Sequence, residues 1–316
     1  MTSIGGYFSL ELPYCEEYHK DALKLNTGRN CLEYILRCRQ YSKVYIPYYT
    51  CDVILEPFQK LGIPFDFYHI NLDLEITDNI QLKKNEALLY TNYYGLKQKY
   101  TETLAEKYGQ QLIVDNTQAF YAKPIEGIDT FYTCRKFFGV PDGAYLYINT
   151  KLEEELEQDV SYERMSFLTK RIDLGAEAGY ADFREQSHLL IGQPIKQMSK
   201  LTERLMQSIN YQLIADQRRK NFKLLHDSLK SSNLYNIHLD EEAVPMVYPY
   251  LTARKGLREF LIQNKIFIAT YWSSVLKFNQ INLSEQQLVN QLLPLPIDQR
   301  YLDEDMNRII KHIVNE

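Results

Sequence analysis

The chain has 316 residues, and 45% of them are hydrophobic, which is enough to build about two domains with apolar cores. Its formal net charge of −5 gives no positive field that would attract nucleic acid or an anionic membrane. No apolar run reaches the roughly 20 residues of a membrane span, and the N-terminus does not have a signal-peptide pattern. Five cysteines form no CxxC pair. We therefore expect a protein of the reducing cytoplasm that has no disulfide framework.

Short apolar runs alternate with helical patterns between Asn26 and Asn149, which predicts an α/β domain with a mostly parallel sheet covered by helices. The expected elements, in chain order, are a helix over 31–38, a strand over 43–47, apolar runs at 53–62, 65–71 and 87–95, a helix over 100–109, and strands at 111–115 and 142–148.

Longer helices are expected after Asn149. The segment from Met198 to Leu229 carries apolar residues at helical spacing, which predicts one long or broken helix with an apolar face. Its apolar positions are Leu201, Leu205, Ile209, Leu213 and Ile214. A strand-like run at 246–251, a helix over 256–265, a strand-like run at 266–272 and a helix from about Asp303 follow. We interpret residues 1–200 as a large domain and residues 201–316 as a smaller α+β domain.

Two adjacent cations, Arg135 and Lys136, interrupt the aromatic segment from Phe131 to Tyr147, which otherwise has the pattern of a buried run. Upstream, Asp115 ends the apolar strand 111–115, and ligands of open α/β sheets bind at the carboxyl ends of strands. A buried lysine and a buried carboxylate on separate strands meet the needs of pyridoxal phosphate chemistry. The lysine joins the cofactor aldehyde, and the carboxylate keeps the pyridine nitrogen protonated.

Each of these residues also has a simpler interpretation. Asp115 alone would more often be a cap or turn residue, and Lys136 could extend its ammonium to the surface past its aromatic neighbours. If Lys136 is buried beside Arg135, both effects disfavour its ammonium form and make the amine more nucleophilic.

A polar turn with glycine precedes the first helix in the stretch LNTGRNCLEYIL, from Leu25 to Leu36. Backbone N–H groups at a helix start bind phosphate. Thr27 would add a hydroxyl, and Gly28 would permit an unusual backbone angle. The same turn could be an ordinary helix cap.

Taken together, these segments resemble the DegT/StrS family of pyridoxal phosphate-dependent sugar aminotransferases, which have the aspartate aminotransferase type of fold (fold type I). The similar stretches are Thr27 to Leu32, Pro47 to Thr50, Asn92 to Gly95, Val114 to Ala119, Thr133 to Lys136, Pro141 to Ala144 and the LPLP segment near the C-terminus. They cover most of the chain and occur in the family's order.

The resemblance implies a set of roles. Lys136 and Asp115 would be catalytic, Gln118 would hydrogen-bond the cofactor's phenolic oxygen, and Asn92 would face the ring where many members carry histidine. Thr133 and the Thr27-Gly28-Arg29 turn would hold the phosphate. The family also implies a homodimer that moves an amino group from an amino acid, for which glutamate is expected, to a nucleotide-linked keto sugar for surface polysaccharide or a related glycan.

The sequence departs from the family mainly where the substrate binds. Arg29 replaces a small hydroxyl residue and could bind the phosphate with its guanidinium. The family's Gly-x-Asn-x-Arg loop is absent, and residues 179–186 occupy roughly its place. The expected substrate contacts are Tyr49, Tyr93, Tyr94, Tyr180, Phe183 and Arg184.

Other functions stay open at this point. A different pyridoxal phosphate reaction on the same scaffold, such as a dehydration or a non-sugar transamination, is one, and a non-catalytic regulatory homologue is another. No GxGxxG follows a strand, which argues against a nicotinamide dehydrogenase, and the six histidines do not have the spacing of metal ligands, so no metal is expected.

Overall fold

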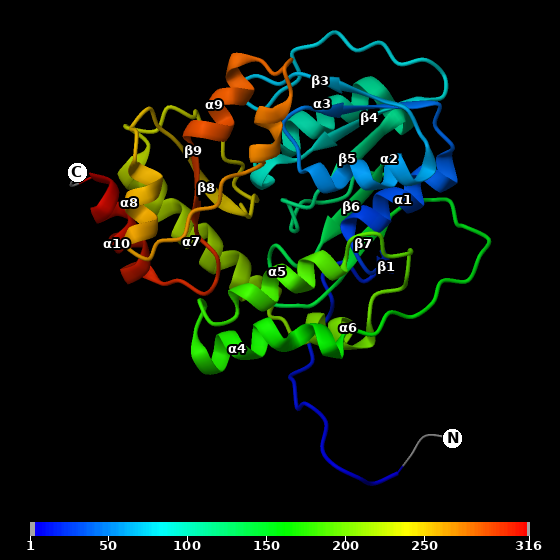
Figure 1. Ribbon diagram of the computed structural model, residues 1–316, viewed down its shortest axis with the longest axis horizontal. Coiled ribbons are helices and arrows are strands. Elements are labelled where there is room, and N and C mark those ends of the chain that lie inside the picture. The colour runs from blue at the N-terminus through cyan, green and yellow to red at the C-terminus, as the bar shows by residue number, and fades with distance from the viewer. Residues whose placement is uncertain (1–3, 315–316) are drawn as a thin grey trace.

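The structure, a computed structural model, describes residues 4–314. A twisted seven-stranded sheet with the order β1-β7-β6-β5-β4-β2-β3 forms the centre of the larger part of the molecule (Figure 1). Strand β7 runs antiparallel to both β1 and β6, and the other neighbours are parallel. A separate antiparallel pair, β8 and β9, belongs to the C-terminal part. The predicted α/β class and the smaller C-terminal α+β part are therefore confirmed.

The strands are β1 (Leu23–Leu25), β2 (Lys43–Pro47), β3 (Phe65–Tyr68), β4 (Glu86–Thr91), β5 (Leu112–Asp115), β6 (Asp129–Thr133), β7 (Ala144–Tyr147), β8 (Val247–Leu251) and β9 (Leu292–Pro296). The α-helices are α1 (Gly28–Arg39), α2 (Leu55–Leu61), α3 (Gln98–Tyr108), α4 (Ser166–Leu174), α5 (Tyr180–Leu189), α6 (Lys200–Met206), α7 (Tyr211–Leu229), α8 (Leu257–Gln263), α9 (Leu283–Gln291) and α10 (Asp303–Val314).

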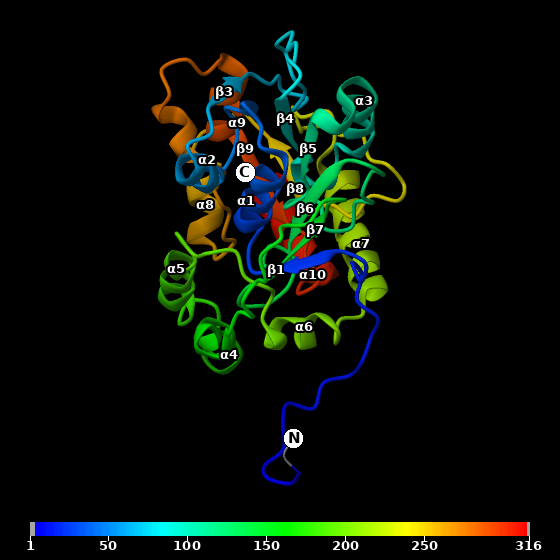
Figure 2. The ribbon, with the colours of Figure 1, turned by 90° about the vertical axis from the view of Figure 1, so that its right-hand side faces the viewer.

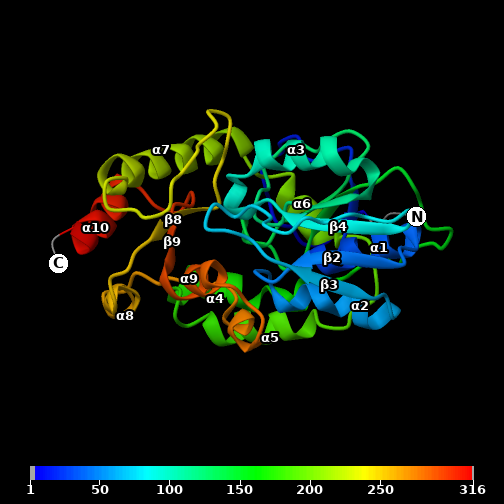
Figure 3. The same cartoon turned by 90° about the horizontal axis from the view of Figure 1, so that it is seen from above.

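Helices cover both faces of the large sheet, with α3 and α7 on one side and α1 and α2 on the other (Figure 3). The inner strand β4 is buried along its whole length because its side chains alternate between two cores. Leu88 and Tyr90 pack into the core that also contains Leu104 of α3, whereas Leu89 packs into the core of α1 with Leu32 and Ile35. This doubly covered sheet explains why its strands are continuous apolar runs in the sequence.

The carboxyl ends of three central strands meet at one edge of the sheet. Asp115 is the last residue of β5, and it lies in register with Thr91 of β4 on one side and Phe131 of β6 on the other. Helix α1 begins next to this edge, and its first residue, Gly28, lies close to Phe131 and Thr133. The predicted phosphate turn and the predicted carboxylate are therefore neighbours.

The C-terminal part has a core of its own, in which α7, α8 and α10 pack against β8 and β9. The segment from Met198 takes the broken form of its prediction, whereas a second expectation in this part is wrong. The helical segment from Met198 is broken into α6 and α7, and Leu213 on its expected apolar face is 66% exposed. The strand predicted at 266–272 is wrong: Lys265 and Trp272, which bound the segment, have positive φ angles, and the segment pairs with neither β8 nor β9, although Ile266 and Ile268 are buried.

The N-terminal residues from 4 to about 11 extend away from the body of the molecule, and Arg204 of α6 holds the carbonyl oxygens of Leu12 and Pro13 (Figure 2). Within the described residues, no helix combines the length and the apolar character that crossing a membrane requires.

Candidate functional site

A cavity of about 180 Å³ lies at the carboxyl edge of the sheet. It brings together six of the residues that the sequence singled out, namely Thr27, Gly28, Arg29, Asp115, Thr133 and Lys136. They come from the start of α1, the ends of β5 and β6, and the loop after β6. The parallel strands bring these ends together although Thr27 and Lys136 are more than a hundred residues apart in the chain.

Asp115 is a buried carboxylate at the end of β5, with 6% of its surface exposed. One of its oxygens, Oδ1, accepts a hydrogen bond from the backbone N–H of Thr117 at 2.8 Å. Burial raises the pKa of this carboxyl, while the positive charge of Lys136 and the hydrogen bonds from Thr117 counteract the rise. A positively charged ligand group placed against Asp115, in addition to Lys136, would favour the ionised form of this carboxyl and would itself be stabilised by it.

Lys136 differs from its prediction in one respect: its side chain is exposed rather than buried. The neighbouring residues Cys134, Phe137 and Phe138 are buried, so the aromatic run was correctly interpreted as interior, but the lysine points out of it and lines the cavity. Its Nζ donates a hydrogen bond to Oγ1 of Thr117 at 2.9 Å.

Thr117 therefore links the lysine to the carboxylate, because its hydroxyl contacts Lys136 and its backbone N–H contacts Asp115. Sequence reasoning did not identify this threonine. The available signal was its position two residues after a strand-ending aspartate, where a backbone N–H commonly reaches back to the carboxylate.

The cavity also contains groups of the kind that bind phosphate in other proteins. Thr27 is the N-cap of α1, with its Oγ1 accepting from the N–H of Asn30 at 3.2 Å, and the other N–H groups of the first turn have no partner within the helix. Thr133 adds a second hydroxyl. Gly28 has an ordinary helical conformation, so the expected unusual backbone angle is wrong. A glycine fits here because a Cβ at this position would lie only 3.3 Å from Cγ2 of Thr117.

Two arginines border this cavity. Arg29 forms an ion pair with Glu56 of α2, so its guanidinium already has a carboxylate partner. Arg135 is less well compensated: its Nη2 donates to Oγ of Ser187 at 3.3 Å, and its buried Nε has no hydrogen-bond partner within residues 4–314. Burial and then repulsion from Arg29 lower the pKa of Arg135 to about 10.

Asn92 and Gln118 are close to this edge but do not line the cavity. The amide of Asn92 accepts from the N–H of Lys97 at 3.0 Å and donates to Gln98 at 3.2 Å, which closes the turn after β4. Oε1 of Gln118 accepts from the N–H of Tyr94 at 3.1 Å and so supports Tyr94 at its positive φ of 57°. In this structure both amides hold a turn.

The expected substrate residues divide into separate groups. Tyr49 and Tyr94 are fully buried and share a hydrogen bond of 3.1 Å between their hydroxyls, and Tyr93 is buried beside them. Arg184 is exposed on α5 and lines neither cavity described here. Tyr180 and Phe183 line a different, second cavity.

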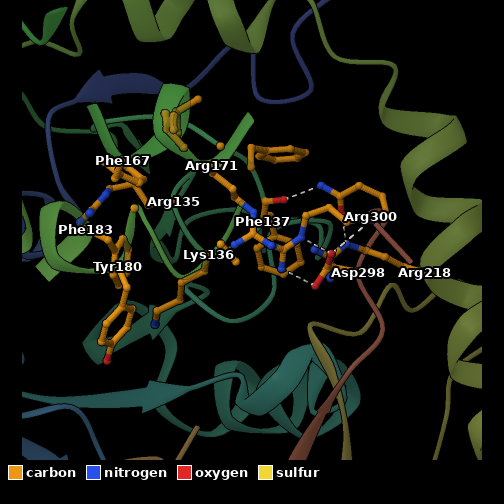
Figure 4. A pocket seen from close by; sticks show the side chains of 17 residues that line it. Arg135, Lys136, Phe137, Phe167, Arg171, Tyr180, Phe183, Arg218, Asp298 and Arg300 are labelled. Atoms are coloured by element: carbon orange, nitrogen blue, oxygen red, sulfur yellow. Dashed lines mark hydrogen bonds and ion pairs between the residues drawn. The ribbon is translucent and has the colours of Figure 1, made fainter. Parts of the chain in front are cut away.

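This second cavity has a volume of about 370 Å³ and lies beside the first. The loop from 135 to 140, helices α4 and α5, Arg218 of α7 and residues 298–300 form its walls. Figure 4 shows Tyr180 and Phe183 on one side of Lys136 and Arg218, Asp298 and Arg300 on the other. Arg135 and Lys136 line both cavities, so the second one adjoins the candidate amine.

The Pro-Asp-Gly stretch after the lysine has a structural role. Asp142 is fully buried and accepts hydrogen bonds from Ser199, through its N–H at 3.0 Å and its hydroxyl at 2.8 Å, and from the Thr202 hydroxyl. Gly143 has a φ of +107°, and a Cβ there would lie only 2.8 Å from Thr202. The turn therefore anchors the start of α6 and fixes the lysine loop from behind.

Comparison with solved structures decides the fold. The proposed sugar aminotransferase Spr1654 from Streptococcus pneumoniae, in its apo form, matches with a TM-score of 0.67 at 12% identity, over 96% of this chain and 91% of that one. A DegT DnrJ EryC1 StrS aminotransferase from Brucella abortus matches with a TM-score of 0.60 at 14% identity, over 94% and 88%. The chain has the fold type I architecture of these aminotransferases.

An enzyme of a different reaction matches equally well. GDP-4-keto-6-deoxymannose-3-dehydratase (ColD), in a variant with bound GDP-perosamine, gives a TM-score of 0.62 at 14% identity, over 95% of this chain and 93% of that one. No family model and no curated protein sequence matches the chain. At these identities the likeness establishes the fold, and function has to be argued from the site.

The donor set of the first cavity fits a pyridine ring that carries a phosphate. The buried carboxylate of Asp115 suits a protonated ring nitrogen, and the helix start with the hydroxyls of Thr27 and Thr133 suits a phosphate. The amine of Lys136 lines the same cavity and is connected to the carboxylate of Asp115 through Thr117. Among the described residues, no group of three or more His, Cys, Asp or Glu side chains has a geometry that could hold a metal ion.

Proposed function

We propose that the protein is a pyridoxal phosphate-dependent aminotransferase that transfers an amino group from an amino acid, glutamate by resemblance, to a nucleotide-linked keto sugar. The observation that carries this proposal is the Lys136–Thr117–Asp115 hydrogen-bonded chain in a cavity that also contains a helix start. The solved structures of Spr1654 include forms named for pyridoxal phosphate and pyridoxamine phosphate, which supports the same cofactor for this fold.

The residues would hold the cofactor at both of its ends. Thr27, Thr133 and the first-turn N–H groups of α1 would bind the phosphate, and Asp115 would bind the pyridine nitrogen. When bound, pyridoxal phosphate supplies an aldehyde that a lysine amine can join and a ring that accepts electrons from a substrate carbon. Arg29 would contribute positive charge to the phosphate end while it remains paired with Glu56.

Lys136 would perform two tasks. It would hold the cofactor covalently between turnovers, and its released amine would then accept and return the proton at the substrate carbon. Thr117 would orient this amine, because its hydroxyl is the hydrogen-bond partner of Nζ. The exposure of Lys136 at the cavity wall suits both tasks, since the amine has to be accessible to the ligand.

We also propose that the chain works as a homodimer. The support is the resemblance together with exposed apolar side chains in the segment from 160 to 191, among them Ile172, Leu174, Tyr180, Leu189 and Ile191. The division into domains near residue 200 likewise stays a proposal, which is compatible with the separate core of α7, α8 and α10.

Cofactor attachment and amino transfer can be tested in one experiment. The purified protein is supplied with pyridoxal phosphate, reduced with borohydride and mapped by peptide mass spectrometry, and the cofactor mass is expected on Lys136. Exposure of the unreduced protein to glutamate should then bleach the cofactor's visible absorbance, and nucleotide keto sugars should restore it. Attachment to another lysine would refute the site. Restoration by simple keto acids alone would indicate an amino-acid aminotransferase, and release of water from the sugar without amino transfer would indicate a dehydratase.

A further inference from the structure

Two surface segments carry a disproportionate share of the exposed apolar side chains. Within residues 4–314, more than half of the exposed large hydrophobic residues lie in two short stretches, 4–14 and 160–191. The first stretch is the N-terminal arm, a name we keep for residues 4–14, and the second contains α4 and α5. Apolar surface that is concentrated in this way is typical of a face that binds another protein.

Helices α4 and α5 have little support from the core of their own chain. No residue of α4 is buried, and Gln186 is the one buried residue of α5. The two helices contact each other through the rings of Phe167 and Phe183, at a centroid distance of 5.6 Å. Helices of nine and ten residues are marginally stable in water unless an apolar face is covered. The pair and the turn after it expose Ile172, Leu174, Leu189 and Ile191.

The N-terminal arm is also without cover. It extends away from the body of the molecule, and Arg204 of α6 holds its base through the carbonyl oxygens of Leu12 and Pro13 (Figure 2). Residues 4–11 make no hydrogen bond or ion pair with the rest of the described chain. The apolar side chains that the arm exposes are Ile4, Tyr7, Phe8, Leu10 and Tyr14, each at least 66% exposed.

The arm and α4 lie at the same end of the molecule, away from β3 and α9 (Figures 1 and 2). We propose that the arm of one copy packs across α4 and α5 of a second copy, which returns its own arm in the same way. A two-fold pair brings the same surface of both copies together, so each arm can reach the helices that lack cover. The inference rests on the proposed homodimer and names the segments that would form its contact.

Charge favours a second copy over an anionic membrane as the partner of the arm. Glu11 is the one charged residue of the arm, which therefore has no cation for anionic headgroups. Helices α4 and α5 expose Arg171 and Arg184, and neither forms an ion pair within residues 4–314. An arm laid across these helices would bring its carboxylate to unpaired cations.

The same contact would support a wall of the second cavity. Helices α4 and α5 contribute Phe167, Arg171, Tyr180 and Phe183 to this wall, and Lys136 lines the same cavity. Because elements with few buried residues open at a low free-energy cost, cover by a partner's arm would keep these helices in place. Formation of the pair and the shape of the space beside Lys136 would then be linked.

Sedimentation of the full chain tests the contact from both of its sides. The key variants are Phe8→Asp in the arm and Ile172→Asp on α4, which each place a charge in the proposed contact. Ser9→Asp is the control for the first, because neighbouring residues of an extended chain point to opposite sides. Leu283→Asp is the control for the second, since Leu283 on α9 is 81% exposed and Ile172 is 84% exposed.

We expect wild type to dimerise, and the dissociation constant of the dimer to rise by about tenfold or more in Phe8→Asp and Ile172→Asp. It should stay within about twofold of wild type in Ser9→Asp and Leu283→Asp. In both key variants the amides of 166–189 should exchange with solvent deuterium at least about tenfold faster than in wild type. A monomeric wild type, or a dimer that neither key variant weakens, would overturn the proposal.

Cross-linking separates exchange between copies from packing of the arm on its own chain. One preparation carries photoreactive benzoylphenylalanine in place of Phe8, and the other is wild type labelled with heavy nitrogen. The two are mixed at a dilution at which subunits exchange, then concentrated and irradiated. We expect unlabelled arm peptides joined to labelled peptides of α4 or α5. Cross-links between unlabelled peptides alone would mean that the arm covers its own chain, and mixed cross-links outside α4 and α5 would place it elsewhere. Either result would contradict the proposal.

These outcomes are separate from those that test the proposed function. If the cofactor attaches to Lys136 and keto sugars are aminated while Phe8→Asp dimerises normally, the aminotransferase stands and the arm contact is wrong. If the arm cross-links to α4 or α5 of a second copy but no cofactor attaches to Lys136, the contact stands and the aminotransferase is wrong.

Discussion

The two adjoining cavities are built in different ways. In the first, at the sheet edge, the polar groups largely satisfy one another, through Lys136 with Thr117, Thr117 with Asp115, and Arg29 with Glu56. In the second, cations from four distant segments meet with one carboxylate among them. The difference agrees with the proposal that the first holds the reacting groups, whereas the second has positive charge that no side chain of this part of the chain pairs directly.

The largest effect should follow from removing the amine of the first cavity. We predict that Lys136→Ala lowers amino transfer by at least about 10³-fold, because both covalent attachment and proton transfer are lost. The thermal midpoint should change little, since the side chain is exposed and makes one hydrogen bond. Steady-state assays and a melting curve measure the two effects. Activity within tenfold of wild type would show that another residue carries the chemistry.

Removal of the negative charge of Asp115 should have the second-largest effect on activity. We predict that Asp115→Asn lowers kcat by about 10²-fold, since a neutral amide does not keep a ring nitrogen protonated, while it still accepts from Thr117. Burial raises the folded-state pKa of Asp115, so the stability that this carboxyl contributes is present below its unfolded pKa and is lost as the pH rises through its folded pKa. The cofactor-free Asn variant should therefore be slightly more stable at pH 7 than wild type. A lower melting midpoint would contradict this account of the burial.

Acid sensitivity should come from a third region, outside both cavities. Burial lowers the pKa of His19 to about 4, and its Nε2 lies 2.8 Å from the carbonyl oxygen of Phe120 and therefore donates. Below about pH 6.5, His19 of the unfolded chain binds a proton that His19 of the folded protein does not bind. The free energy of unfolding therefore decreases as the pH falls toward 4. When the pH is lowered from 7.5 to 5, the free energy of unfolding measured with urea should decrease by about 2 kcal/mol more for wild type than for His19→Gln. Parallel losses in the two proteins would assign the acid response to other groups.

The smallest predicted effect concerns the link between the amine and the carboxylate. Thr117→Val keeps the shape of the side chain and its backbone hydrogen bond but removes the hydroxyl that Lys136 contacts. We expect kcat to fall by about tenfold with little change in KM, because the amine loses its orientation. Thr117→Ser, which keeps the hydroxyl, serves as the control and should stay within about threefold of wild type. Equal losses in both variants would mean that packing against Gly28 matters more than the hydroxyl.

Much of the first cavity could be predicted from the sequence because its parts lie at the ends of elements. An apolar strand that ends in Asp115 and a polar turn that opens a helix at Gly28 are local patterns, and a parallel sheet brings such ends to one edge. The site assignments stay predictions, but the structure does bring six of these residues together. The exposure of Lys136 was one of two open interpretations, and the sequence could not choose between them because an aromatic context predicts burial of the backbone and does not give the direction of one side chain.

The sequence by itself determined the alternation of buried runs, the strand ends and the order of the elements, because these depend on residues near one another in the chain. Only the tertiary structure decided which groups face a common space. Asn92 and Gln118 support a turn because Lys97, Gln98 and Tyr94 lie within reach of their amides. The second cavity brings together residues from 135 to 300 that share no spacing. Contacts between side chains distant in sequence depend on how helices pack on the sheet, and a local pattern does not contain that information.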